Sequence, residues 1–117
     1  MTSITTHVLD TSRGRAAEDV PVLIEQQKGA TWTERARGTT NADGRISAWV
    51  SQEKSGAPSF PSGTYRMTFQ TSVYFQSRGV QGFYPFVTII FEVRDGDSHT
   101  HVPLLLSPYG YSTYRGS

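Results

Sequence analysis

The chain has 117 residues, a net charge of +1 and no cysteine. This length suits one domain with one hydrophobic core, and the near-neutral charge without a Lys/Arg run argues against nucleic acid as a partner. The absence of cysteine excludes disulfides and thiolate metal sites. No apolar run is long enough to span a membrane, and no targeting segment precedes the first predicted strand. We therefore expect a cytoplasmic protein with no membrane partner.

Short segments rich in β-branched and aromatic residues follow one another along nearly the whole chain, and turn-forming residues separate them. This spacing predicts an all-β fold, an eight-stranded antiparallel β-sandwich. The strands are expected at residues 4–10, 20–27, 31–37, 44–50, 64–71, 86–94, 99–106 and 109–115.

One segment, residues 72–78, favours a helix of about two turns. Ser72 is a suitable N-cap residue, and Gly79 suits the position just after the last helical residue. We therefore expect one short helix between the fifth and sixth strands.

Side chains of a strand alternate between its two faces. If the more aliphatic set of each strand faces the core, then His7, Arg45 and His101 point outward. The same outward faces carry three apolar residues, which are Leu9, Trp49 and Leu105. A monomer would leave that apolar surface in water, so we expect a polar cluster inside an oligomer interface.

The last four residues, Tyr114-Arg115-Gly116-Ser117, follow an apolar strand directly. Chain ends usually fray and tolerate almost any sequence. A tyrosine, a fixed cation, a glycine and a hydroxyl beside a terminal carboxylate instead indicate a compact polar cluster, to be read together with His7, Arg45 and His101.

Several segments of the chain resemble one family, the 5-hydroxyisourate hydrolases, which are transthyretin-like enzymes of urate degradation. The matching segments are TTHVLD (5–10), DGR (43–45), TYRMTF (64–69), FYP (83–85), HVPLLLSP (101–108) and YRGS (114–117). The departures concern loops: Arg15-Ala16 and Asp19 stand where the family often has proline and glycine, Phe86 stands where an acidic residue is common, and residues 52–62 are irregular.

The resemblance implies two four-stranded sheets with one short helix, formed by a single domain of residues 1–117. It also implies a homotetramer, a dimer of dimers whose active sites lie in the channel between dimers. The expected reaction is hydrolysis of 5-hydroxyisourate, a small purine-derived substrate, to 2-oxo-4-hydroxy-4-carboxy-5-ureidoimidazoline. The implied site residues are His7, Arg45, His101, Tyr114, Arg115, Gly116 and Ser117, with no cofactor and no metal.

These side chains suit hydrolysis of a ring amide-type bond. Histidine titrates near neutral pH, so His101 or His7 can act as the base on water, and the residues do not say which. Arg45 offers a permanent charge and directional donors to a developing oxyanion. Ser117 offers a hydroxyl and a carboxylate that can orient water, a histidine or the substrate. His99 is expected at the edge of the site or on the surface.

Two other functions remain open from the residues. A carrier built on the same sandwich would bind an aromatic ligand in the channel between dimers, but it has no need of two histidines, an arginine and the terminal cluster together. An adhesion or carbohydrate-binding module would use exposed aromatic residues, for which Trp32, Trp49 and Tyr74 are the candidates.

Overall fold

The computed structural model describes residues 2–51 and 58–117. The irregular segment expected at residues 52–62 therefore lies partly outside the described residues. No helix in the described part of the chain is long and apolar enough to cross a membrane.

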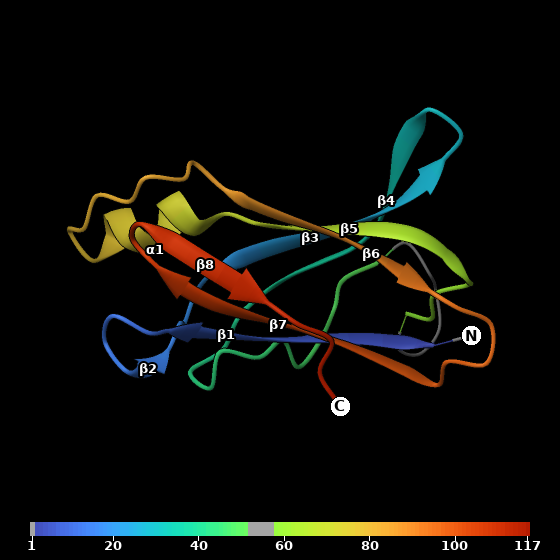
Figure 1. Cartoon of the computed structure of the whole chain (residues 1–117), viewed down its shortest axis with the longest axis horizontal. Coiled ribbons are helices and arrows are strands. Elements are labelled where there is room, and N and C mark those ends of the chain that lie inside the picture. Colours follow the sequence, from blue (N-terminus) through green and yellow to red (C-terminus); the bar gives the residue numbers. More distant parts are fainter. Residues whose placement is uncertain (1, 52–57) are drawn as a thin grey trace.

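The fold is a sandwich of two four-stranded sheets with one short helix, as expected (Figure 1). One sheet has the order β2-β1-β7-β8 and the other the order β4-β3-β5-β6. The elements are β1 (Ser3–Asp10), β2 (Arg15–Ala16), β3 (Pro21–Lys28), β4 (Thr31–Thr39), β5 (Gly63–Phe69), α1 (Thr71–Ser77), β6 (Val87–Val93), β7 (His99–Ser107) and β8 (Gly110–Thr113).

The first sheet departs from the antiparallel expectation at its centre, because β1 and β7 pair in parallel over the whole length of β1. These strands lie near opposite ends of the chain, and the entire second sheet connects them. Parallel neighbours need such a long connection. The other pairs are antiparallel, and short turns join three of them, which are β1 with β2, β3 with β4 and β7 with β8.

Alternation along β1 and β7 follows the prediction. Ile4 and Val8 of β1 and Leu104 and Leu106 of β7 are buried in the core, while His7 lies half-buried on the opposite face. The two strands therefore present one apolar face to the second sheet and one mixed face outward.

The strand expected at residues 44–50 does not form. This segment makes isolated bridges only, first His7 with Arg45 in one sheet and then Arg37 with Val50 in the other. It crosses between the two sheets and so cannot run as a strand in either. The count of eight strands is reached instead by β2, a two-residue strand that the sequence did not indicate.

The crossing also changes the orientation expected for Trp49. Its indole N–H donates to the Ile4 carbonyl oxygen at 3.0 Å, and the ring packs against the core, so it does not share an outer face with Arg45. Val50, expected to face the core, is instead 66% exposed.

The helix begins at Thr71, one residue earlier than expected, and no side chain caps it. Its end agrees with the prediction: Gly79 has a φ of 67° and donates its N–H to the Gln76 carbonyl oxygen.

The buried carboxylate of Asp10 connects the end of β1 to α1. One oxygen accepts bonds from the N–H and hydroxyl of Ser12 and from the Arg13 N–H, and the other accepts the Tyr74 hydroxyl at 2.8 Å. Burial raises the pKa of Asp10, but these hydrogen bonds outweigh it and hold the pKa below its ordinary value.

We predict that Tyr74→Phe destabilises the fold by about 1–3 kcal/mol at pH 7, because one bond to a buried charge is lost. A carboxyl whose folded pKa is lowered stabilises the fold above its unfolded pKa of about 3.9 and loses this contribution as the pH falls through the folded value. The difference between the variant and the original chain should therefore shrink in acid.

Urea unfolding at pH 7 and pH 3, at one fixed protein concentration, measures both effects. Tyr84→Phe is the control, because the Tyr84 hydroxyl has no hydrogen-bond partner among residues 2–51 and 58–117. Equal losses for Tyr74→Phe at both pH values would contradict the assigned role of the Asp10 charge.

Candidate functional site

The polar residues predicted for the site gather around an open groove of about 580 Å³ on the outer side of the first sheet. Four separate segments build it: β1, the turn before Ile46, β7 and the C-terminal tail. The lining residues are Thr5, Thr6, His7, Asn41, Arg45, Ile46, Ser47, His99, His101, Tyr114, Gly116 and Ser117. Six of the seven predicted site residues are among them, and Arg115 is not.

Strand pairing places the histidines. In the parallel register of β1 and β7, Thr5 lies opposite His101 and His7 lies opposite Pro103. His7 and His101 therefore occupy the outward face of two neighbouring strands, two residues apart along the ladder.

A tight turn brings Arg45 to the same face. The Asn41 side-chain oxygen accepts the N–H groups of Asp43 and Arg45, at 2.9 and 3.1 Å, and the Gly44 carbonyl accepts the Val8 N–H at 2.8 Å. Gly44 has a φ of 75°, and a Cβ there would collide with the Val8 carbonyl oxygen. Only glycine permits this docking, which sets the backbone of Arg45 beside His7.

The tail is held against β7 by its backbone. The Gly116 N–H donates to the His101 carbonyl oxygen at 2.9 Å, and a Cβ at residue 116 would overlap the His101 ring. Glycine is therefore required for the chain to pass this close to the histidine. The same contact leads Ser117 into the groove, while Tyr114 stays 58% exposed at its rim.

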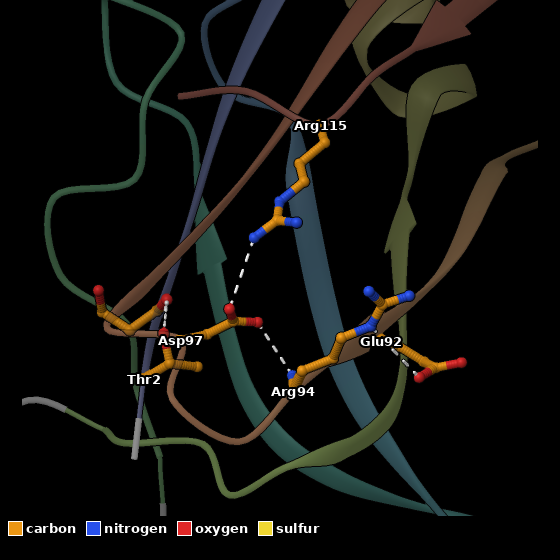
Figure 2. Close-up of polar contacts among 6 residues, drawn as sticks. Thr2, Glu92, Arg94, Asp97 and Arg115 are labelled. Carbon is orange, nitrogen blue, oxygen red and sulfur yellow. Dashed lines mark hydrogen bonds and ion pairs between the residues drawn. The ribbon is translucent and has the colours of Figure 1, made fainter.

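Arg115 points the other way, out of the groove. Figure 2 shows its guanidinium reaching toward the Asp97 carboxylate, 3.5 Å away, whose other oxygen accepts the Arg94 N–H at 3.0 Å. The residue thus connects the tail to the turn between β6 and β7. This contact holds the tail against the turn that carries Asp97, and Arg115 does not line the groove.

Hydroxyl groups connect the histidines of β7 to β1. Thr5 Oγ1 lies 2.8 Å from His101 Nδ1 and 3.1 Å from His99 Nε2, and Ser3 Oγ lies 2.9 Å from His99 Nδ1. Thr5 and Ser3 were not among the site residues predicted from the sequence, although alternation places both on the outward face of His7. His99 is exposed at the edge of the groove, as expected.

The electrostatic setting favours a neutral His101. Partial burial lowers the pKa of His101, and the charge of Arg45 lowers it further, followed by His99 and His7. Its Nδ1 is occupied by Thr5, so Nε2 is the ring nitrogen left for a ligand. Within residues 2–51 and 58–117, no group of three or more His, Cys, Asp or Glu side chains is arranged to hold a metal ion.

The groove therefore combines a basic nitrogen, a second histidine and a permanent cation from separate segments. Such a set can take a proton from water, stabilise an oxyanion and return a proton to a leaving group.

The sequence is similar to that of several known hydrolases. It is 44% identical over 115 residues to a probable 5-hydroxyisourate hydrolase of Caenorhabditis elegans, covering 98% of this chain and 82% of that protein. It is 45% identical over 115 residues to a 5-hydroxyisourate hydrolase of Salmonella typhimurium, covering 97% and 80%. The mouse 5-hydroxyisourate hydrolase is 37% identical over 116 residues, covering 97% and 94%.

Solved structures give the same fold. The 5-hydroxyisourate hydrolase of Klebsiella pneumoniae matches with a TM-score of 0.82 and 38% identity, covering 100% of both chains. Sea bream transthyretin, solved in complex with thyroxine, matches with a TM-score of 0.85 and 30% identity, covering 97% of this chain and 93% of that one. The sequence model of the HIUase/Transthyretin family matches residues 4–116, so this chain belongs to that family.

Proposed function

We propose that this protein is a 5-hydroxyisourate hydrolase, which opens the six-membered ring of its substrate by adding water. The observation that carries the proposal is the groove, where four segments of the chain bring together His7, Arg45, His101 and Ser117. Relatives named 5-hydroxyisourate hydrolase are 37–45% identical to this chain. The proposed unit is one domain of residues 1–117, and the proposed location is the cytoplasm, for which cell fractionation is the test.

In the proposed mechanism, His101 is the base that activates water. A lowered pKa keeps His101 unprotonated at neutral pH, and its free Nε2 can accept a proton from a water placed in the groove. His7, across the groove on β1, then contacts the substrate or its leaving nitrogen. The sequence left the choice between the two histidines open, and we propose His101 because its pKa is lowered and its Nδ1 is already bonded to Thr5.

Arg45 and the tail complete the site. The Arg45 guanidinium is charged at all working pH values, so it can neutralise the oxyanion that forms when water adds to the ring carbonyl. Ser117, with its hydroxyl and carboxylate, orients water or substrate, while Tyr114 and Gly116 shape the wall of the groove. Arg115 supports the tail through Asp97.

We further propose that the active protein is a homotetramer, a dimer of dimers. Leu9 and Leu105 lie side by side on the outward face near the groove, and both are only half-buried. Further large apolar side chains are exposed: Tyr109 at 75% and Tyr111 at 42% follow β7 in the chain, and Ile90 at 63% lies on β6 of the second sheet. A second copy of the chain would cover such a surface.

The carrier alternative rests on the same fold, because a transthyretin bound to thyroxine matches it as well as a hydrolase does. The deciding experiment generates 5-hydroxyisourate freshly with urate oxidase and follows its ultraviolet decay with and without this protein. Since the compound also decays unaided, the rates must be compared. A hydrolase accelerates the decay in proportion to enzyme concentration, and a carrier does not.

We predict that His7→Asn and His101→Asn each lower the rate of 5-hydroxyisourate hydrolysis by about 10²–10⁴-fold, because proton transfer is lost. Arg45→Lys keeps the charge but loses the planar fork of donors, so it should also be severely impaired. Circular dichroism and light scattering verify that each variant keeps its fold and assembly. A folded variant with near-normal rates would remove its residue from the mechanism.

The tail gives a separate prediction. Deleting residues 114–117 should abolish turnover while leaving the sandwich folded, because three of these four residues are exposed and none belongs to the core. Ser117→Ala tests the hydroxyl alone, and a C-terminal tag tests the carboxylate and the space around it. An N-terminal tag is the control. Full turnover by the deletion variant would show that the tail has no part in the chemistry.

The assembly can be measured directly. We predict that light scattering at micromolar concentration gives a mass near four chains. A clean monomer that still hydrolyses 5-hydroxyisourate would exclude a site shared between subunits.

A further inference from the structure

A continuous chain of hydrogen bonds runs along the outward face of β1 and β7, from His101 in the groove to Ser3 and His99 at the beginning of these two strands. It starts at His101 Nδ1, passes through Thr5 Oγ1 to His99 Nε2, and continues from His99 Nδ1 to Ser3 Oγ, with separations of 2.8, 3.1 and 2.9 Å. The parallel register makes this geometry possible, because it sets Ser3 opposite His99 and Thr5 opposite His101. The two imidazole rings stack nearly parallel, with their centroids 6.2 Å apart.

The number of protons on these groups allows only two consistent sets of donor and acceptor directions along the hydrogen-bond chain. Each hydroxyl carries one proton, and each neutral imidazole carries one. If His101 Nε2 is bare, then Nδ1 donates to Thr5, Thr5 donates to His99 Nε2, and His99 Nδ1 donates to Ser3. If His101 Nε2 carries the proton, every bond of the chain points the opposite way.

We propose that Thr5 and His99 form a proton relay for His101, in which Thr5 sets the tautomer and His99 holds the proton between the two halves of the reaction. The relay rests on the proposed hydrolysis. Thr5 and His99 act through His101 and are positioning residues, since the reacting atoms meet His101 Nε2.

The proton transfers of the relay begin with the attacking water. A water O–H bond breaks and its proton joins His101 Nε2, while the resulting hydroxide adds to the substrate carbonyl carbon. The proton on His101 Nδ1 passes to Thr5 Oγ1, and the original Thr5 proton passes to His99 Nε2. His101 ends neutral with a proton on Nε2, and His99 carries the positive charge. As the C–O bond forms, the electron pair of the carbonyl π bond moves onto the carbonyl oxygen. The carbonyl then re-forms while the C–N bond breaks, and the leaving nitrogen takes the Nε2 proton. Each transfer along the relay then reverses and the starting arrangement returns.

The surroundings favour this movement of charge from His101 to the water-exposed edge of the groove. His101 is half-buried and shares the groove with the Arg45 cation, with His7 and with Ser117, and both burial and Arg45 lower the pKa of His101. His99 is exposed to water at the groove's edge, where a cation is better solvated. An imidazolium at His99 therefore costs less than one at His101.

The tautomers can be measured without substrate by ¹⁵N NMR of histidine-labelled protein. We expect His101 to carry its proton on Nδ1 in the free protein, and Thr5→Val, which keeps the branched shape but removes the hydroxyl, to abolish this preference. Thr5→Ser should restore it. His99→Gln can still accept a bond from Thr5 but cannot take up a proton, so it should retain the tautomer.

Turnover separates the two roles. Thr5→Val and His99→Gln should each lower kcat by about 10- to 100-fold, less than loss of His101 itself, because the base remains but the relay is broken. Thr5→Ser should recover most of the rate. Thr68→Val is the matched control, since the Thr68 hydroxyl bonds the Thr88 hydroxyl in the other sheet and Thr68 does not line the groove, and it should keep the original kcat.

Several results would overturn the relay. One is a proton on Nε2 of His101 in the free protein, and another is an unchanged kcat in Thr5→Val or His99→Gln. Equal impairment of Thr5→Val and Thr5→Ser would assign the loss to packing. If the original chain does not hydrolyse 5-hydroxyisourate at all, the proposed function fails, and the tautomer measurement still decides whether Thr5 orders His101.

Discussion

The parallel pairing of β1 with β7 is the constraint on which the rest of the site depends. Its register is set by burial, because Ile4 and Val8 must share a core face with Leu104 and Leu106. A slip of one residue would turn every side chain of β1 to the opposite face and carry His7 into the core. The hydrophobic effect on one face therefore fixes, on the other, which hydroxyl meets which histidine.

The remaining parts of the groove are attached to this pair through the main chain. Gly44 and Gly116 each bring a backbone segment so close to β1 or β7 that a single methyl group would not fit. The backbone hydrogen bonds of Gly44 and Gly116 to these strands thereby place the next residues, Arg45 and Ser117, at the groove. A site built in this way loses little freedom when substrate binds, because its groups are already in place.

Alternation predicted the outward faces of β1 and β7 from the sequence, and with them His7 and His101. It misled at residues 44–50, where the pattern resembles a strand but the segment bridges two sheets, so Trp49 turns inward to bond Ile4. The direction of Arg115 could not be read either, since it depends on where the turn carrying Asp97 lies in space. Periodicity indicates which face of a strand a residue occupies. Which residues it contacts across the fold depends on the register of strand pairing and on where segments pass from one sheet to the other.

The same sandwich carries a thyroxine-bound transthyretin and hydrolases of 5-hydroxyisourate, so the fold alone does not distinguish binding from catalysis. The two functions differ in whether the groove needs charged and proton-transferring groups. A passive carrier needs shape and apolar contact. Here burial and a permanent cation lower the pKa of His101, and the Thr5 hydroxyl links that histidine to His99, which is exposed to water. In the proposed relay, His101 is kept neutral and His99 can accept its proton, which suits a reaction in which protons are taken and returned.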